Sequence, residues 1–373
     1  MIGYLRPTAI VLAMLTASGP VWADFAGGRA ALKRGDYATA LREYTNAAQA
    51  GEARAQNDLG VLYERGQGVK QDYAEAARWY RKAAEQGYAQ GATNLGYLHE
   101  SGNGVQRDYS QALAWYQKAA DSNWAQAQNN LGGLYERGRG VTRDYQRALM
   151  WYRKAADQGL AQGQTNVGYM LETGRGTARD DGQAMAWYLK AAAQGFAQAE
   201  NNIGALYERG RGVAQSSTTA VTWYRKAVAK GLAQAQTNLG FMLATGKGVE
   251  RNDVEAVKLY RAAAEQGFAQ GQNNLGFMLA YGRGTKRDYL QAKSWYEKAV
   301  DQGLAQAMMN LAGLYEFGRG VAKDQAQALA LYQKSAEAGH RPAALRLVDV
   351  YTKGQLGESI DPARAKLWAD RAI

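Results

Sequence analysis

The sequence predicts an all-α protein, a solenoid of tandem helix-turn-helix repeats of 36 residues. A glycine pair returns at this period from Gly66/Gly68 to Gly318/Gly320, and an alanine and a tyrosine return from Ala76 and Tyr80 to Ala328 and Tyr332. An aliphatic residue follows the same period without a gap, at Leu59, Leu95, Leu131, Val167, Ile203, Leu239, Leu275, Leu311 and Leu347. Such self-similarity indicates helix pairs that bury their apolar faces by stacking on their neighbours.

Helix A, the first helix of each repeat, is predicted over residues 55–64 and their equivalents. Leu59, Leu62 and Tyr63 stand at positions i, i+3 and i+4, which share one face of an α-helix. Gly60 is unfavourable inside a helix, so its recurrence indicates the close approach of a neighbouring helix. The Gly-x-Gly loop then ends the helix, because glycine adopts a positive φ without strain.

Helix B, the second helix of each repeat, begins at a capping box. Asp72 is the predicted N-cap and Glu75 follows three residues later. The same pair recurs as Asp108/Gln111, Asn252/Glu255, Asp288/Gln291 and Asp324/Gln327. Helix B is expected to bury Ala76, Trp79, Tyr80 and Ala83, and Gly87 is its predicted stop.

The two ends depart from the repeat. Residues 24–52 contain one match to helix B behind a shortened helix, and residues 341–373 resume the pattern one position late, so both are expected to cap the eight repeats of 53–340.

Residues 1–23 have the features of a signal peptide. Arg6 precedes an apolar run at Ala9–Ala17, and Val21-Trp22-Ala23 fits the small-x-Ala cleavage pattern, with the predicted cut between Ala23 and Asp24. A membrane anchor is the alternative, but the run is too short to cross a bilayer. We therefore expect a periplasmic or secreted protein without stable membrane insertion after cleavage.

Net charge limits the classes of partner. Removing residues 1–23 takes away Arg6 and no acidic residue, so the net charge falls only from +11 to +10. In an exported chain this charge favours an acidic protein or an anionic envelope polymer over nucleic acid.

Composition also limits the chemistry. The chain has no Cys, which excludes disulfides and thiolate metal sites. His99 and His340 lie in different repeats, so no metal site or cofactor is expected. A Glu recurs at 64, 100, 136, 172, 208 and 316, and a ladder of this kind is interpreted as a solvated face. We find no catalytic constellation.

The repeat motif, best displayed by residues 125–159, resembles the Sel1-like repeat, a longer relative of the tetratricopeptide repeat. The resemblance covers essentially the whole chain after residue 23 and implies a right-handed α-solenoid whose inner face is formed by the A helices. It implies a scaffold or adaptor that binds proteins in the envelope or in a host. A cysteine-rich branch is linked to penicillin binding and weak β-lactamase activity. That alternative is weakened here because Cys and the Ser-x-x-Lys motif are both absent.

The candidate ligand contacts are residues that vary on the fixed frame. By analogy with the tetratricopeptide repeat, the inner groove is expected at positions 54, 57, 61, 64 and their equivalents. Positions 57 and 61 alternate between two residue types with a 72-residue superperiod, and this alternation breaks at Phe241 and Phe277. Inheritance with packing is one explanation and ligand contact is the other. The groove residues proposed as contacts are Tyr97, Tyr169, Phe241, Phe277, Tyr281 and Met309.

The glycine loops offer a second surface. Arginines stand between the two glycines and could line one edge that holds an acidic partner, namely Arg139, Arg175, Arg211, Arg283 and Arg319. A solvated edge is the alternative. Phosphate cradles are not expected, because each loop ends a helix instead of opening one after a strand.

Overall fold

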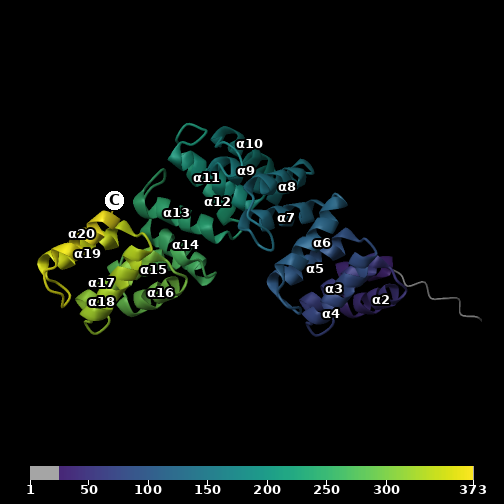
Figure 1. Cartoon of the computed structure of the whole chain (residues 1–373), viewed down its shortest axis with the longest axis horizontal. Helices are drawn as coiled ribbons and strands as arrows, with labels where there is room; N and C mark the ends of the chain where they lie inside the picture. Colours follow the sequence, from purple (N-terminus) through teal and green to yellow (C-terminus); the bar gives the residue numbers. More distant parts are fainter. Residues whose placement is uncertain (1–24, 373) are drawn as a thin grey trace, which may run out of the picture. The chain divides into compact units, whose positions relative to one another are not determined.

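The computed structural model describes residues 25–372, in which every regular element is an α-helix (Figure 1). The predicted signal peptide, residues 1–23, and its cleavage site lie outside the described residues. The A helices are α1 (Phe25–Lys33), α3 (Ala53–Arg65), α5 (Ala89–Ser101), α7 (Ala125–Arg137), α9 (Ala161–Thr173), α11 (Ala197–Arg209), α13 (Ala233–Thr245), α15 (Ala269–Tyr281), α17 (Ala305–Phe317) and α19 (Arg341–Lys353). The B helices are α2 (Tyr37–Gln49), α4 (Tyr73–Glu85), α6 (Tyr109–Asp121), α8 (Tyr145–Asp157), α10 (Asp181–Ala193), α12 (Ser217–Val228), α14 (Asp253–Glu265), α16 (Tyr289–Asp301), α18 (Gln325–Glu337) and α20 (Pro362–Arg371).

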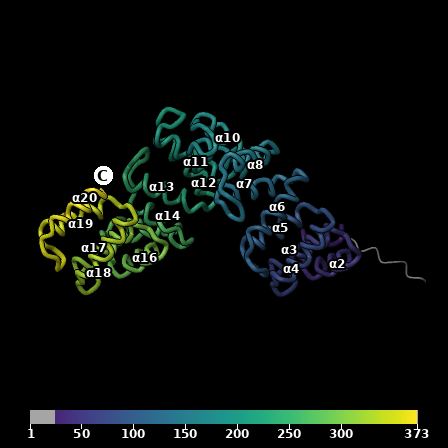
Figure 2. The backbone as a smooth tube through the Cα atoms, in the orientation of Figure 1, coloured from purple at the N-terminus to yellow at the C-terminus, as the bar shows by residue number. Residues whose placement is uncertain are grey.

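Within each unit, outside α8, successive helices pack on one another, which confirms the all-α solenoid of 36-residue helix pairs (Figure 2). The structure divides within α8 into two compact units, residues 25–151 and 152–372, each of which is described by itself. In the first unit α5 contacts both α3 and α7, and in the second α15 contacts both α13 and α17. The A helices therefore form one layer of each unit and the B helices the other. Among the described residues no helix is long and apolar enough to cross a membrane.

The predicted starts and stops of the helices are confirmed. The Asp72 carboxylate accepts a hydrogen bond from the Glu75 backbone amide at 2.9 Å, which caps α4. The equivalent caps form at Asp108, Asn252, Asp288 and Asp324. At the end of α3, Gly66 takes a φ of 66°, a conformation that glycine adopts without strain.

The core of the first seven repeats contains a tyrosine ring packed against a glycine, and the eighth repeat has Ala312 in place of the glycine. Tyr80 is fully buried, and a Cβ built on Gly60 would lie 2.7 Å from its ring. The glycine inside helix A therefore admits an aromatic ring of its own helix B. Leu59 and Leu62 of helix A and Ala76 of helix B are also buried around this contact.

A buried amide ladder explains the 72-residue superperiod. The Asn57 side-chain oxygen accepts a hydrogen bond from the Asn94 amide of the next repeat at 3.0 Å. The same bond joins Asn201 to Asn238 and Asn273 to Asn310. In alternate repeats a threonine stands at this position, and the Thr93 hydroxyl bonds instead to the Ala89 carbonyl of its own helix. Through the sixth repeat the residues at position 57 are buried, so there the assignment of this position to the groove is wrong, whereas Asn273 and Met309 at the same position line cavities.

The packing of the tyrosine ring against helix A can be tested by substituting two glycines of the A helices. A Cβ on Gly204 would lie 2.7 Å from the Tyr224 ring, so Gly204→Ala should destabilise the fold by about 1–3 kcal/mol through overpacking. A Cβ on Gly313 would meet only the Tyr332 hydroxyl, at 3.9 Å. Gly313→Ala should therefore leave stability unchanged or raise it by about 0.5–1 kcal/mol. Thermal melting followed by circular dichroism compares the two, and equal effects would contradict this account of the core.

Candidate functional site

The recurrent glutamate of helix A binds the hydroxyl of the buried tyrosine. The Tyr80 hydroxyl donates to the Glu64 carboxylate at 2.5 Å. The same bond joins Tyr116 to Glu100, Tyr188 to Glu172, Tyr224 to Glu208 and Tyr332 to Glu316, at 2.7–3.1 Å. The interpretation of this glutamate series as a solvated face is therefore wrong. A buried hydroxyl is costly without a partner, and the carboxylate supplies one.

The same carboxylate also pairs with a basic residue 39 positions later, in the glycine loop of the next repeat. Arg139 lies 3.4 Å from Glu100, Arg211 lies 3.8 Å from Glu172, and Lys247 lies 3.1 Å from Glu208. Each glutamate thus joins its own helix B to the following loop. These basic side chains are 40–44% exposed, so the ion pairs are screened and contribute little to stability.

The sixth and seventh repeats lack this carboxylate. Ala244 and Ala280 stand where the other repeats have glutamate, while the tyrosines are kept as Tyr260 and Tyr296. The Tyr296 hydroxyl makes no hydrogen bond among the described residues. Burial raises the pKa of the Tyr260 phenol, and the Arg283 charge and the Asn274 side chain partly oppose that rise. Two buried phenols therefore lack the acceptor that they have elsewhere.

A cavity of about 300 Å³ opens at the first missing glutamate. It is lined by Phe241, Ala244, Thr245, Tyr260, Gln270, Asn273, Asn274, Phe277, Met278, Arg283 and Gln306. The Arg283 guanidinium bonds to the Ala244 carbonyl at 2.7 Å and to the Asp253 carboxylate at 2.8 Å. Phe241 and Phe277, predicted from the break in the alternation, thus lie in one cavity on successive A helices.

A second cavity, of about 170 Å³, opens at the second missing glutamate. It is lined by Ala280, Tyr281, Tyr296, Met309, Asn310, Gly313, Leu314, Phe317, Arg319 and Tyr332. The Phe277 and Tyr281 rings lie 4.6 Å apart between centroids, and each lines one of the two cavities. This ring pair therefore stands between the two cavities.

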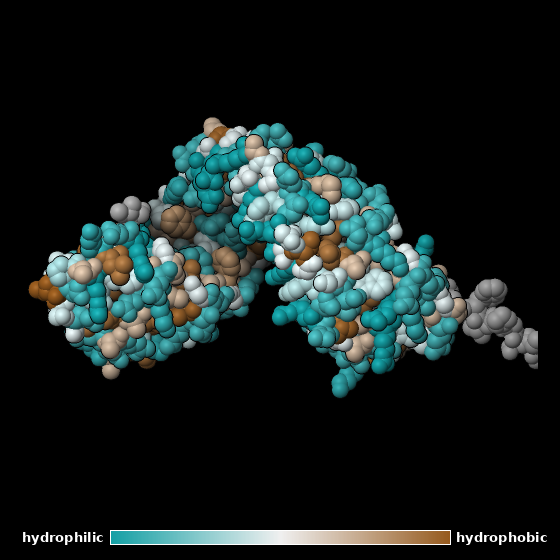
Figure 3. Space-filling view, in the orientation of Figure 1, coloured by the Kyte–Doolittle hydropathy of each residue, from teal (hydrophilic) through white to brown (hydrophobic). Residues whose placement is uncertain are grey.

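The large residues at position 61 are exposed or half-buried. Tyr97 is 50% exposed, Tyr169 36% and Phe241 47%, and Tyr281 is 57% exposed. Phe277 and Met309 are half-buried. Tyr97 belongs to the first unit, and Tyr169 lines neither cavity. On the face shown in Figure 3, hydrophobic residues form small groups between hydrophilic ones. The role of the candidate groove residues as ligand contacts stays a prediction.

The loop arginines all have neighbours within the chain. Arg139 and Arg211 pair with glutamates, and Arg283 with Asp253. The guanidinium groups of Arg175 and Arg319 lie over the Tyr169 and Phe317 rings, at 5.3 and 4.9 Å from the centroids. Their role as a basic edge for a partner stays a prediction.

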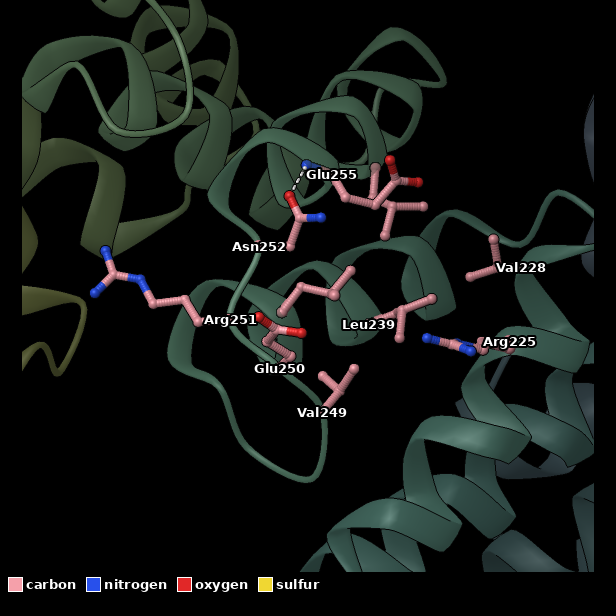
Figure 4. A pocket seen from close by; sticks show the side chains of 10 residues that line it. Arg225, Val228, Leu239, Val249, Glu250, Arg251, Asn252 and Glu255 are labelled. Atoms are coloured by element: carbon pink, nitrogen blue, oxygen red, sulfur yellow. Dashed lines mark hydrogen bonds between the residues drawn. The ribbon is translucent and has the colours of Figure 1, made fainter.

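A larger cavity, of about 580 Å³, lies between α12, α13 and α14 (Figure 4). Leu259 lines this cavity and stands where most repeats have Trp. In the first repeat the Trp79 indole occupies this position and packs between successive helix pairs. The charged lining of the cavity is balanced, with Arg225 and Arg251 against Glu250 and Glu255. Figure 4 shows the Arg251 side chain extending away from the apolar lining. This cavity therefore selects no charge.

The histidines form no site. His99 is buried, and burial lowers the pKa of both His99 and His340. Among residues 25–372 no group of three or more acidic or histidine side chains could hold a metal ion.

Sequence reasoning missed Tyr260, Tyr296 and Phe317 as cavity residues. The available signal for the two tyrosines was that they stand 16 residues after Ala244 and Ala280, where other repeats have glutamate.

Comparison with known proteins assigns the repeats. The Sel1 repeat model matches residues 53–88, 89–124, 125–160, 161–196, 197–232, 233–268, 269–304 and 305–340. The chain is similar to c5321, a protective antigen of uropathogenic Escherichia coli strains with an SLR fold, at 34% identity over 89% of this chain and 79% of that one, with a TM-score of 0.59. It is also similar to a Sel1 repeat protein from Oxalobacter formigenes, at 32% identity over 66% of this chain and 96% of that one, with a TM-score of 0.60. Comparison with curated proteins gave no match.

The pairing of Asp253 gives the site a pH dependence. Hydrogen bonds from Arg251 and Arg283 lower the pKa of Asp253 from 3.8 to about 2. A lowered pKa stabilises the fold above the unfolded value, and the stabilisation is lost as the pH falls from about 4 to about 2. Asp253→Asn should therefore lower Tm at pH 7, and the difference from wild type should shrink toward pH 2. Asp349→Asn, which removes a more exposed ion pair with Lys353, is the control and should change Tm less. A deficit of Asp253→Asn that stays constant with pH would refute the pairing.

Proposed function

Since the chain belongs to the Sel1 repeat family, whose members generally mediate protein–protein interactions, we propose that it is an exported scaffold that holds a protein ligand against Phe241 and Phe277. One observation carries the location of the ligand. Two successive A helices place Phe241, which is exposed, and Phe277, which is half-buried, in one open cavity. Partly exposed aromatic residues around a pocket are the usual anchors of protein interfaces.

The ligand is an extended segment of a protein that lies across the A helices. Beside the aromatic residues runs a row of amides, in which Gln270 donates to Gln306 at 3.2 Å and Asn310 to Asn273 at 2.8 Å. Amide side chains both donate and accept, so this row can bond to the backbone of a bound peptide. The aromatic cavities then hold its side chains.

We place this activity in the periplasm or outside the cell. The signal-peptide pattern of residues 1–23 and the absence of Cys support export without disulfides. A protein 34% identical to this chain is a protective antigen of uropathogenic strains, which supports a role at or beyond the bacterial envelope.

The penicillin-recognising enzyme has no observation in its favour. The chain has no Ser-x-x-Lys motif, and His99 and His340 belong to different units. Hydrolysis of nitrocefin is the direct check on this alternative, and we expect no turnover.

The groove is tested by removing its two anchors. A 12-residue peptide selected on the full chain from a random library serves as the ligand, and its Kd is measured by fluorescence anisotropy. Phe241→Ala with Phe277→Ala should weaken binding by about tenfold or more, because anchor residues carry most of the affinity. Leu290→Ala removes an exposed apolar residue of a B helix and should leave the Kd unchanged.

The melting temperature of the double variant separates the alternatives. It should stay near that of wild type, because Phe241 is largely exposed and Phe277 half-buried. A collapse of the fold would make both residues part of the core. An unchanged Kd with an intact fold would place the ligand elsewhere.

A further inference from the structure

We propose that the two groove cavities are carboxylate receptors, and that the bound segment is an acidic peptide whose Asp or Glu side chains take the places of the two missing glutamates. The inference rests on the proposed function, because it names the chemistry of the ligand in the same groove. The protein's other repeats show which group occupies the position of Ala244 and Ala280.

The other repeats define what the position holds. In the fifth repeat the Glu208 carboxylate accepts from the Tyr224 hydroxyl at 2.8 Å and pairs with Lys247 at 3.1 Å. The second and fourth repeats have the same arrangement, with Glu100 between Tyr116 and Arg139 and Glu172 between Tyr188 and Arg211. A phenol and a cation thus converge on one carboxylate.

In the sixth repeat the phenol and the cation are kept and only the carboxylate is absent. Tyr260 and Arg283 both line the cavity at Ala244. Arg283 uses Nε and Nη2 for Asp253 and the Ala244 carbonyl, and its Nη1 makes no hydrogen bond among the described residues. The lining contains no acidic side chain. A ligand carboxylate can therefore accept from both Nη1 and the phenol.

The seventh repeat repeats this arrangement with fewer competing contacts. Tyr296 and Arg319 both line the cavity at Ala280, and this lining also lacks an acidic side chain. The Tyr296 hydroxyl and the Arg319 guanidinium bond to no carboxylate within residues 25–372. Arg319 lies over the Phe317 ring instead, 4.9 Å from its centroid. A carboxylate here would supply the acceptor that both groups have in other repeats.

The two receptors are next to each other and, unlike the cavity at Leu259, have no acidic side chain in their linings. The Phe277–Tyr281 ring pair stands between them, so the segment should carry two acidic residues flanking apolar contacts. The cavity at Leu259 has equal numbers of acidic and basic side chains and favours neither sign. The net charge of +10 that remains without residues 1–23 favours encounter with an acidic partner.

The decisive variants restore the consensus of the repeat. Ala244→Glu and Ala280→Glu put back the carboxylates that the fold accommodates in the other repeats, so both should fold with an unchanged or higher Tm. Each should weaken binding of an acidic peptide by about tenfold or more, because the peptide carboxylate loses its charged hydrogen bonds to the arginine and the tyrosine. Ala244→Gln and Ala280→Gln fill the same space without the charge. They should weaken binding less than the Glu variants, and equal losses would show that space alone decides.

The probe is a 12-residue peptide selected on the full chain, made in its natural form and with each Asp or Glu replaced by Asn or Gln. We expect the selected peptides to be enriched in acidic residues. The amide forms should bind about tenfold or more weakly. Binding of the natural form should weaken as salt rises, because exposed parts of the ion pairs are screened.

The outcomes separate the two proposals. If Phe241→Ala with Phe277→Ala abolishes binding while the amide peptides bind as well as the acidic ones, the groove stands and the carboxylate inference falls. If neither the alanine pair nor the glutamate pair changes the Kd, both fall. If wild type dimerises in sedimentation and the glutamate variants do not, a second copy of the chain is the occupant, and the inference of a peptide ligand is overturned.

Discussion

The contact between a buried tyrosine of helix B and a glycine of helix A governs the rest of the structure. In the first seven repeats the ring fills the space that glycine leaves, and a Cβ at Gly60, Gly96, Gly204 or Gly276 would lie 2.7 Å from it. The eighth repeat has Ala312 at this position. Burying the ring also buries its hydroxyl, which then requires a partner. In most repeats a glutamate on the next turn of helix A accepts the hydrogen bond of this hydroxyl. The tyrosine therefore determines both the packing of the helix pair and the charge on the groove side of helix A.

Polar contacts recur at fixed offsets, some within a repeat and some between neighbouring repeats. The Gln86 amide donates to the Gln56 oxygen at 2.7 Å, and the Asn94 amide to the Asn57 oxygen at 3.0 Å. The fifth repeat replaces the glutamine pair with Glu200 and Lys230, whose charged atoms lie 2.6 Å apart. Because buried polar groups tolerate few alternative arrangements, the first pair fixes the two helices of one repeat and the second fixes neighbouring repeats. In the fifth repeat both members of the glutamine pair are replaced together.

The site arises where this network is left incomplete. Ala244 and Ala280 remove two carboxylates but keep the phenols and cations that would hold them. The result is two cavities with aromatic walls and one guanidinium each, on a scaffold that is otherwise unchanged. A recognition site can thus form without a new motif, because deleting a side chain from a rigid frame exposes groups that were already in place.

The sequence by itself determined the all-α repeat, its helix boundaries and its capping residues, and it identified Phe241 and Phe277 as candidate contacts. These features follow from local periodicity and from glycine and capping chemistry, which act within a few residues along the chain. Only the tertiary structure showed that the recurrent glutamate is bonded to a tyrosine 16 residues away and to a base 39 residues away, and that the Asn57 position is buried. Those contacts join different helices, and the direction of a side chain across a helix interface depends on how the helices pack. The missing glutamates could be read from the sequence, but the cavities that they leave could not.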